Sequence, residues 1–177
     1  MEFVVLVDTK NRRIGTAPKD TVHTTATPLH RGFSVFLFND QKQILITKRA
    51  SGKKTFPGLW TNAVCGHTAP GETVAKGAKR RLSDELGFTN IKLRVLSDYR
   101  YRFTDANGIV ENEICPILVG YTKDTPLLNK HEADSWKWMN WITFLADIEN
   151  NPSVYSPWCR EEASIIRKLQ EKGQGLP

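Results

Sequence analysis

The feature that most constrains the fold is a short helical pattern set between stretches of strand-like sequence. Apolar residues recur at helical spacing through residues 73–86, at Val74, Ala78, Leu82 and Leu86. They would share one face of a helix and point into a core. Gly87 follows directly, and glycine suits the left-handed residue just after a helix end. A helix with one apolar face needs a second layer to pack against.

Strand-like stretches supply that layer. We predict strands at residues 3–7, 32–38, 43–48, 93–103, 109–121 and 134–141, and further helices at 142–148 and 156–171. Asn39-Asp40 marks a hairpin turn, and Ser156-Pro157 suits a helix start, where serine can cap and proline fits the first turn. Hairpins mixed with separated helices predict an α/β sandwich. With no repeat or linker visible, we expect one domain over residues 1–177.

Composition excludes several classes of protein. No run of about 18 apolar residues occurs, so we expect no membrane span. The first ten residues lack a basic region and a long apolar stretch, so we expect no secretory signal and a cytoplasmic protein. Three cysteines, an odd count, argue against a disulfide framework. The net charge of +6 comes from dispersed basic residues, most of which we interpret as solvated surface.

A pair of carboxylates is the first candidate for chemistry. Glu111 and Glu113 lie in an otherwise apolar predicted strand, and strand side chains alternate, so the two project from one face. Two carboxylates side by side repel unless a cation or a shared proton lies between them. An exposed sheet edge would also tolerate them, but the apolar run that follows favours a pocket.

Cys65, Gly66 and His67 form the second candidate. If this segment is extended, Cys65 and His67 share a face, and Gly66 permits close approach of a ligand. Taken alone, such a Cys and His are more often structural than catalytic. His23 and His30 flank a polar, threonine-rich stretch in which core packing does not explain them. Histidine nitrogen together with carboxylate oxygen suits zinc, manganese or iron, although spacing alone does not assemble a site.

A longer motif connects these candidates. Gly66 is followed after five residues by Glu72, and after seven more by the segment 80–88, RRLSDELGF. This spacing resembles the Nudix signature, whose helix holds divalent cations against a diphosphate. Arg81 and Asp84 stand where the signature has glutamates, whereas Glu85 is retained. Losing a carboxylate and gaining a cation favours a phosphate site that need not hydrolyse its ligand.

Several separate stretches resemble the type I isopentenyl-diphosphate isomerases, which share the Nudix fold. The resemblance runs from about His23 to Trp158. It rests on His23 and His30, and on residues 47–50, 57–62, 65–67, 100–102, 108–116 and 155–158. It implies a Nudix-type α/β/α sandwich with a mixed sheet. It also implies an enzyme of isoprenoid biosynthesis that converts isopentenyl diphosphate to dimethylallyl diphosphate by adding one proton and removing another.

The resemblance also implies roles for individual residues. The catalytic residues would be Cys65, Glu113 and Tyr101, and either Cys65 or Glu113 could be the acid. The substrate would be contacted by Arg49, Lys53, Arg81 and Trp158. One zinc or manganese ion would be held by His23, His30, His67, Glu111 and Glu113. A magnesium ion bound to the substrate diphosphate would be held by Glu85, with the Cys65 backbone as a further ligand. We expect a monomer with an isoprenoid diphosphate as its partner, and neither nucleic acid nor membrane.

Two other functions fit the sequence less well. A Nudix hydrolase of nucleoside diphosphate derivatives is disfavoured by Arg81 and by the His-plus-Glu set of candidate metal ligands. A nucleic-acid-binding module, suggested by the net charge of +6, would need a contiguous basic face with stacking aromatics. The sequence shows no such pattern.

Overall fold

The computed structural model describes residues 1–174; the last three residues of the predicted domain, 175–177, lie outside the described residues. The strands are β1 (Phe3–Val7), β2 (Arg13–Pro18), β3 (His30–Phe38), β4 (Gln43–Arg49), β5 (Trp60–Thr61), β6 (Val64–His67), β7 (Leu93–Ser97), β8 (Arg100–Thr104), β9 (Val110–Ile114), β10 (Ile117–Tyr121) and β11 (Ala133–Asn140). The helices are α1 (Lys19–Val22), α2 (Val74–Leu86), α3 (Trp141–Asn150) and α4 (Pro157–Glu171), with a 3-10 turn at Pro152–Val154.

Strand β3 is the centre of a mixed, mainly antiparallel sheet. Its first residues pair with β1 (antiparallel) and β9 (parallel), and its later residues pair with β6, β10 and β4. Beyond these, β2, β8, β7 and β11 extend the sheet outward. Every strand that carries a candidate site residue therefore lies within one or two strands of β3.

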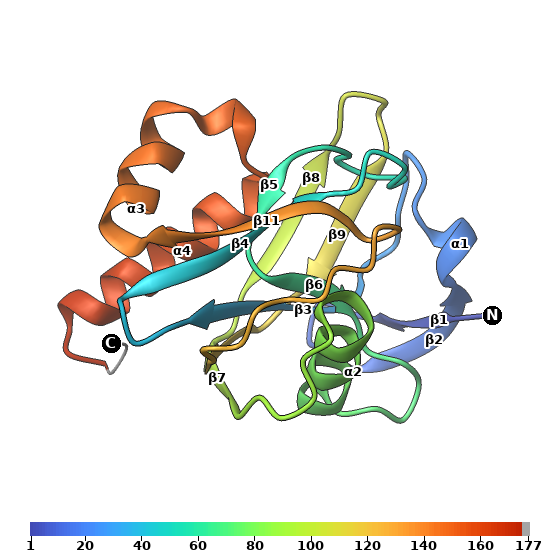
Figure 1. The fold of residues 1–177 in the computed structure, drawn as a ribbon. Helices are drawn as coiled ribbons and strands as arrows, with labels where there is room; N and C mark the ends of the chain where they lie inside the picture. Colours follow the sequence, from blue (N-terminus) through green and yellow to red (C-terminus); the bar gives the residue numbers. More distant parts are fainter. Residues whose placement is uncertain (175–177) are drawn as a thin grey trace.

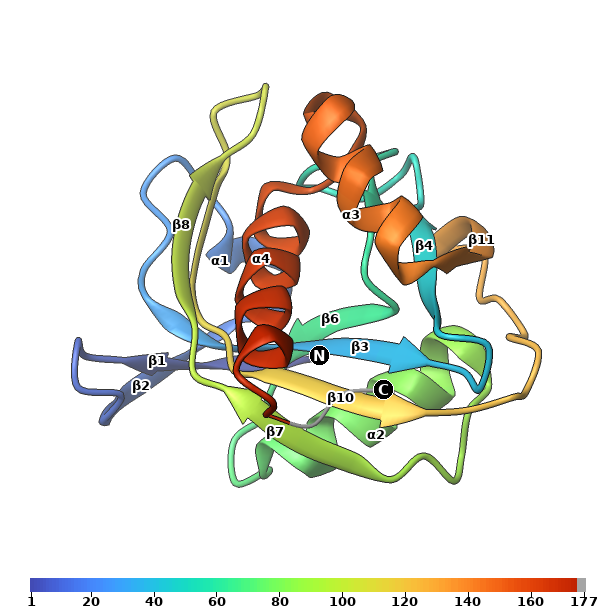
Figure 2. The same cartoon turned by 90° about the vertical axis from the view of Figure 1, so that its left-hand side faces the viewer.

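Helices cover both faces of this sheet (Figures 1 and 2). Figure 2 shows α2 beneath strands β3 and β10, and α4 above them. The α2 side is a core built around Phe33, Leu82 and Leu86, and the side of α3 and α4 is a larger core that contains Phe36, Phe144 and Trp158. The predicted α/β/α layering is confirmed.

The helices begin and end near the predicted residues. The Thr73 hydroxyl accepts a hydrogen bond from the Lys76 backbone N–H, and Gly87 ends α2 with a φ of 72°. Pro157 opens α4 as predicted, but the Ser156 hydroxyl does not cap it. That hydroxyl instead lies 2.8 Å from Oγ1 of Thr61 and ties the start of α4 to β5.

The two long predicted strands were wrong in one respect, because each is divided in two. Residues 93–103 form β7 and β8, and residues 109–121 form β9 and β10. Pro116 has no N–H to donate, so the ladder breaks there. Its carbonyl accepts from Ser34 N at 3.1 Å, while Cys115 N donates to Tyr99 O at 2.8 Å. The break lets β8 and β9 turn away from β7 and β10.

Strands β2, β5 and β6 and helix α1 were not predicted as elements; all four are six residues long or less. Within the described residues, no helix is both long enough and apolar enough to cross a membrane.

Candidate functional site

The pairing register of β3 assembles the first group of site residues. His30 lies opposite Glu113 of β9, and Gly32 lies opposite His67 of β6. Tyr101 of β8 lies opposite Glu113 on its other side. Gly32 is required by this arrangement, since a Cβ atom there would lie 1.8 Å from Oε2 of Glu113. The Glu113 carboxyl therefore occupies the space left by a missing methyl group.

His23 joins this group from the end of α1. The chain that follows it runs along β9, where Val110 N donates to Thr24 O at 2.9 Å and the Asn112 side chain donates to Thr27 O at 3.1 Å. This places Nε2 of His23 3.2 Å from Oε2 of Glu111. The threonine-rich stretch noted in the sequence thus holds His23 against Glu111.

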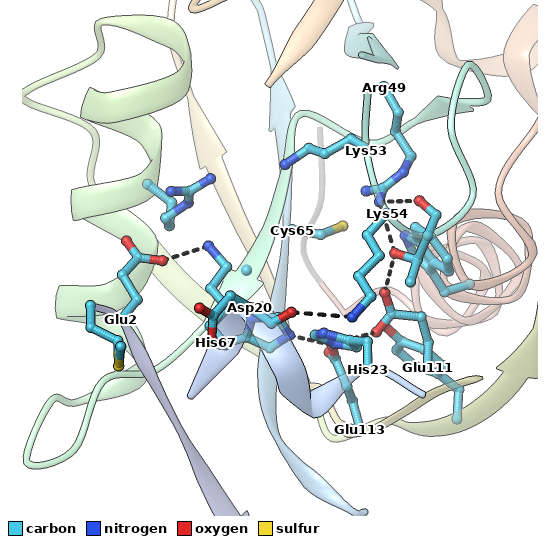
Figure 3. Close-up of a pocket in the computed structure, with 17 residues that line it drawn as sticks. Glu2, Asp20, His23, Arg49, Lys53, Lys54, Cys65, His67, Glu111 and Glu113 are labelled. Carbon is cyan, nitrogen blue, oxygen red and sulfur yellow. Dashed lines mark hydrogen bonds and ion pairs between the residues drawn. The ribbon is translucent and has the colours of Figure 1, made fainter. Parts of the chain in front are cut away.

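Five side chains converge on one point. One ligand atom from each of His23, His30, His67, Glu111 and Glu113 lies within 4.8 Å of all the others. Four of the five are buried and His67 is half-buried. Figure 3 shows His23, His67, Glu111 and Glu113 pointing toward one another at the base of a cavity. Such a set of nitrogen and oxygen donors suits a transition metal.

The polar atoms of the cluster fit a bound cation. His23 Nε2, His30 Nε2 and Glu111 Oε2 are buried without a well-aligned hydrogen bond among the described residues. Their ion-pair contacts stay inside the cluster, at 3.2 Å between His23 and Glu111 and 3.5 Å between His30 and Glu113. Nδ1 of His30 lies 2.9 Å from the carbonyl of Pro28, which turns Nε2 into the cluster. The Thr55 hydroxyl donates to the other Glu111 oxygen at 2.5 Å. Such outer contacts fix the orientation of metal ligands.

The electrostatics of the cluster agree with this arrangement. Burial works to raise the pKa of Glu113, but His67 and His30 outweigh it and hold that pKa well below its usual range. Nε2 of His67 is 2.9 Å from Oε1 of Glu113. Burial lowers the pKa of His67 itself. The pKa of His30 moves the other way: burial lowers it, but Glu113 outweighs burial and raises it. Metal binding requires an ionised carboxylate and deprotonated imidazole nitrogens, and the pKa shifts of Glu113 and His67 favour those states.

Cations line the opposite part of the same cavity, whose volume is about 520 Å³. Arg49, Lys53 and Arg81, which we expect to contact the substrate, line it, and so do Lys19 and Lys54. Figure 3 shows Arg49 and Lys53 across the cavity from the His and Glu cluster, with Cys65 near its middle. Lys54 instead reaches the cluster side, where its Nζ donates to the Asp20 carbonyl at 3.1 Å. A cavity with positive charge at one end suits an anionic ligand such as a phosphate ester.

Arg49 connects the two parts of the cavity. Its Nη2 donates to the carbonyl of Thr55 at 2.7 Å, and the Thr55 hydroxyl reaches Glu111. Its guanidinium lies 5.2 Å from the centre of the Trp158 ring. The backbone of Phe56, next to Thr55, has a φ of 47°, a conformation that costs free energy in a residue other than glycine.

Arg81 is held from behind by two carboxylates. Its Nη2 lies 2.8 Å from Glu85 and 3.0 Å from Glu132, and Glu132 also binds Lys53. Burial opposes these charges, but Glu85 and Glu132 raise the pKa of Arg81. Despite burial, Lys53 and Arg81 lower the pKa of Glu132 to about 2. The Arg81–Glu85 pair, which on a helix surface would contribute little, is buried at this site.

The Cys65 thiol is held by a set of buried hydrogen bonds. It donates to Oδ1 of Asn62 at 3.1 Å, and the Asn62 amide is anchored on the carbonyls of Val35 and Val64. The Ser34 hydroxyl lies 3.5 Å from its sulfur. Burial raises the pKa of Cys65 to about 12.

Aromatic rings form the wall beside Cys65 and Glu113. Trp158 stacks on Tyr101 with ring centres 5.8 Å apart, and Phe56 meets Trp158 edge-on at 5.1 Å. Trp158 both lines the cavity and packs in the core.

The structure places ten of the twelve predicted site residues on the cavity. The other two are behind it: His30 is fully buried under the cluster, and Glu85 lies behind Arg81. Cys115 and Cys159 are core residues and His131 is exposed. A Cβ atom on Gly66 would lie 3.0 Å from Arg81 and 3.1 Å from Phe33. The glycine therefore leaves room for these two side chains and not for a ligand alone.

Several residues at the site were missed. They are Lys19, Lys54 and Thr55 on the cavity, Gly32 beneath Glu113, Ser34 and Asn62 around Cys65, and Glu132 behind Arg81. Lys54 was visible as the neighbour of Lys53 but was interpreted as surface. The others have no local signal, because their positions follow from the strand register and from loop packing.

Comparisons with known proteins agree with this geometry. The family profile described as "NUDIX domain" matches residues 28–159. A protein of Saccharopolyspora erythraea named isopentenyl-diphosphate Delta-isomerase is 44% identical over 170 residues, which are 96% of this chain and 88% of that protein. A protein of the same name from Paenarthrobacter aurescens is 45% identical, and the match covers 89% of this chain and 86% of that protein. Another from Rhizobium rhizogenes is 38% identical, and the match covers 95% of this chain and 81% of that protein.

Solved structures share the fold. A protein from Deinococcus radiodurans superposes with a TM-score of 0.75 at 20% identity and covers 92% of this chain and 98% of its own. A MutT protein from Methanosarcina mazei superposes with a TM-score of 0.68 at 16% identity and covers 81% and 96%. At these identities the likeness concerns the fold alone.

Proposed function

This chain belongs to the type I isopentenyl-diphosphate Delta-isomerases of the Nudix family, and we propose that it converts isopentenyl diphosphate to dimethylallyl diphosphate. One observation carries the proposal. A single cavity holds a His and Glu metal-ligand cluster and Cys65 on one side and the cations Arg49, Lys53 and Arg81 on the other. A small molecule with a diphosphate at one end and an alkene at the other matches this division.

The cluster of His23, His30, His67, Glu111 and Glu113 would hold one zinc or manganese ion. Such an ion would supply charge that fixes and polarises the Glu113 carboxyl. A magnesium ion that enters with the substrate would take Glu85 as a ligand, with the Cys65 backbone as a further one. Glu85 would then turn away from Arg81, which would keep its bond to Glu132.

Cys65 and Glu113 would perform the two proton transfers. Isomerisation adds a proton to the terminal alkene carbon and removes one from the CH2 group bonded to the internal alkene carbon. An acid and a base must therefore both reach this end of the substrate. Glu113 on β9 and Cys65 on β6 both line the cavity, and Tyr101 lies beside Glu113 in the strand register. Either group could start as the donor.

The aromatic wall would protect the intermediate. Protonation of the alkene leaves a tertiary carbocation, which water would trap, so the alkene end must be largely dry. Trp158, 2% exposed, offers a ring face that stabilises a cation by about 2 kcal/mol when desolvated. The Tyr101 ring stacked against it completes an apolar surface.

Hydrolysis is disfavoured at the same site. Arg81 occupies the position of a helix glutamate in the Nudix signature, and it is buried between Glu85 and Glu132. A guanidinium at this position binds a phosphate but cannot ligate magnesium or activate water. The substitution therefore favours retention of the diphosphate through the reaction.

A direct assay compares the two enzyme functions. The purified chain is incubated with magnesium and either isopentenyl diphosphate or a nucleoside diphosphate sugar, and proton and phosphorus NMR follow the products. We expect a dimethylallyl product from the first substrate and no cleavage of the second. Cleavage of the nucleotide without any dimethylallyl product would reverse the assignment in favour of the hydrolase.

A further inference from the structure

A buried carboxyl on α4 has no role in the mechanism above. Glu162 is 0% exposed, and its Oε2 has no hydrogen-bond partner among the described residues. Its Oε1 has a long contact with the Cys115 sulfur at 3.9 Å, and the Ser34 hydroxyl also acts on the carboxyl, which lowers its pKa against the effect of burial. Burying a poorly paired carboxyl costs free energy, which an apolar side chain would avoid. A residue kept at such a cost suggests a function.

Trp158 lies one helical turn before Glu162 on α4. Residues four apart on a helix are neighbours on its surface. The indole Nε1 of Trp158 is also buried without a hydrogen-bond partner among the described residues. The indole N–H can only donate, and a carboxyl oxygen accepts. Two complementary groups, each unpaired, therefore stand one turn apart behind the cavity wall.

Glu162 also reaches the Cys65 thiol through two intermediates. The Cys115 sulfur that contacts Glu162 is 3.4 Å from the Ser34 hydroxyl, which is 3.5 Å from the Cys65 sulfur. Ser34 is directly opposite Cys65 in the β3–β6 register. The Ser34 hydroxyl thus lies between the Cys65 sulfur, the Cys115 sulfur and the Glu162 carboxyl, and the group to which it donates affects the other two. The Cys65 proton is already directed at Asn62.

We propose that Glu162 is a positioning residue of this site, which orients the Cys65 thiol through Cys115 and Ser34 and offers the Trp158 indole N–H an acceptor one helical turn away. The inference rests on the proposed isomerase function. An acceptor at the indole N–H also increases the electron density of the ring, which strengthens its attraction for a cation. Both consequences concern the alkene end of the substrate.

Burial raises the pKa of Glu162 well above its usual range, which favours the neutral form of the carboxyl. A neutral carboxyl presents one carbonyl acceptor and one donor, as a glutamine amide does. Glutamine should therefore replace it, whereas an apolar residue of similar length should not. The helix also offers a matched control in Glu161, which is exposed and accepts from the Tyr99 hydroxyl at 2.7 Å.

The test compares Glu162→Met, Glu162→Gln and Glu161→Gln. Glu162→Met should melt at the same temperature as the unchanged chain or higher, because an unpaired buried carboxyl is removed. Its kcat should fall about 10- to 100-fold, as is common when an outer group that orients a site is lost, and its KM should stay within about threefold. Glu162→Gln should keep most of the kcat, and Glu161→Gln all of it.

A normal kcat in Glu162→Met would overturn the proposal, and so would a Glu162→Gln variant as slow as Glu162→Met. A lower melting temperature with normal turnover per folded molecule would show a structural role only. The Trp158 indole N–H resonance, assigned with Trp158→Phe, gives a readout that needs no turnover. It should shift in Glu162→Met and not in Glu161→Gln; an unshifted resonance also contradicts the proposal. Absence of isomerase activity in the unchanged chain would instead contradict the proposed function.

Discussion

Single atoms decide whether this site can form. The Glu113 carboxyl occupies the space above Gly32, and the Cys65 thiol is fixed by one amide oxygen of Asn62. The first constraint is not local in the sequence, since Gly32 and Glu113 meet only because β3 and β9 run side by side. The second is local, because Asn62 and Cys65 are three residues apart. Filling the space above Gly32 and removing the Cys65 sulfur each test one of these constraints.

Replacing Gly32 with alanine should disrupt the His and Glu cluster that would hold the metal ion. The added Cβ would lie 1.8 Å from Oε2 and 2.6 Å from Cδ of Glu113, so the carboxyl must move away from His30 and His67. We expect loss of tightly bound metal by elemental analysis and loss of turnover, with far-UV circular dichroism unchanged. Gly52→Ala is the control, because no atom lies within 4 Å of a Cβ built there. Equal metal content and turnover in the two variants would refute this reading of Gly32.

Replacing Cys65 with alanine should abolish turnover and leave stability nearly intact. Acid–base groups each contribute about 10²–10⁴-fold, and no water could substitute in a closed pocket. The half-buried thiol leaves a smaller cavity than the core truncations that cost about 2–5 kcal/mol. Cys159→Ala, in the buried core, should show the reverse: a lower melting temperature and turnover close to normal. Retained turnover in Cys65→Ala would refute the proton-transfer scheme.

Elements position the cations as well as the metal ligands. Arg81 on α2 and Lys53 on the loop after β4 meet at Glu132, which precedes β11. This carboxylate joins three segments that are distant in the sequence. Its backbone is fixed too, because Ala50 N donates to Glu132 O at 3.0 Å.

Glu132→Gln should destabilise the fold near neutral pH by about 1–2 kcal/mol, a discounted value because the side chain is partly exposed. The pKa of Glu132 is lowered from 4.5 to about 2, so its contribution is complete above about pH 4.5 and is lost as the pH falls toward 2. The difference in melting temperature between the variant and the unchanged chain should therefore shrink between pH 5 and pH 3. Glu149→Gln, at an exposed pair, should show little difference at any pH. If the difference in melting temperature between Glu132→Gln and the unchanged chain grew as the pH fell, Glu132 would not be the stabilising ionised partner of Lys53 and Arg81.

Helices were predicted more accurately than the sheet for a physical reason. The apolar spacing of α2 and α4 and the Gly87 stop are local signals, and both helices lie within two residues of their predicted bounds. The division of two strands depends on Pro116 and on the contacts of Ser34 and Tyr99 across the sheet. Spacing alone showed Glu111 and Glu113 on one face, but only family resemblance grouped them with three histidines. Neither spacing nor family resemblance pointed to Glu132 or Glu162, because the contacts of each depend on tertiary packing.

At the scale of the whole molecule, the metal cluster ties together parts of the chain that would otherwise be held by strand pairing alone. Its ligands come from the end of α1 and from β3, β6 and β9. Removing the metal with a chelator should lower the melting temperature, since a ligand at 100 times its Kd stabilises a fold by about 2.7 kcal/mol. Zinc or manganese should restore it. An unchanged melting temperature together with full activity in chelator would exclude a resident metal ion.

The central claim is that this chain moves a double bond by proton transfer and keeps the diphosphate intact. The most direct measurement is the reaction of isopentenyl diphosphate in D2O with magnesium, followed by proton, deuterium and phosphorus NMR. Protonation from groups that exchange with solvent should place deuterium in the new methyl group of dimethylallyl diphosphate, with both phosphorus signals retained. Release of phosphate without a dimethylallyl product, or unchanged substrate, would contradict the account.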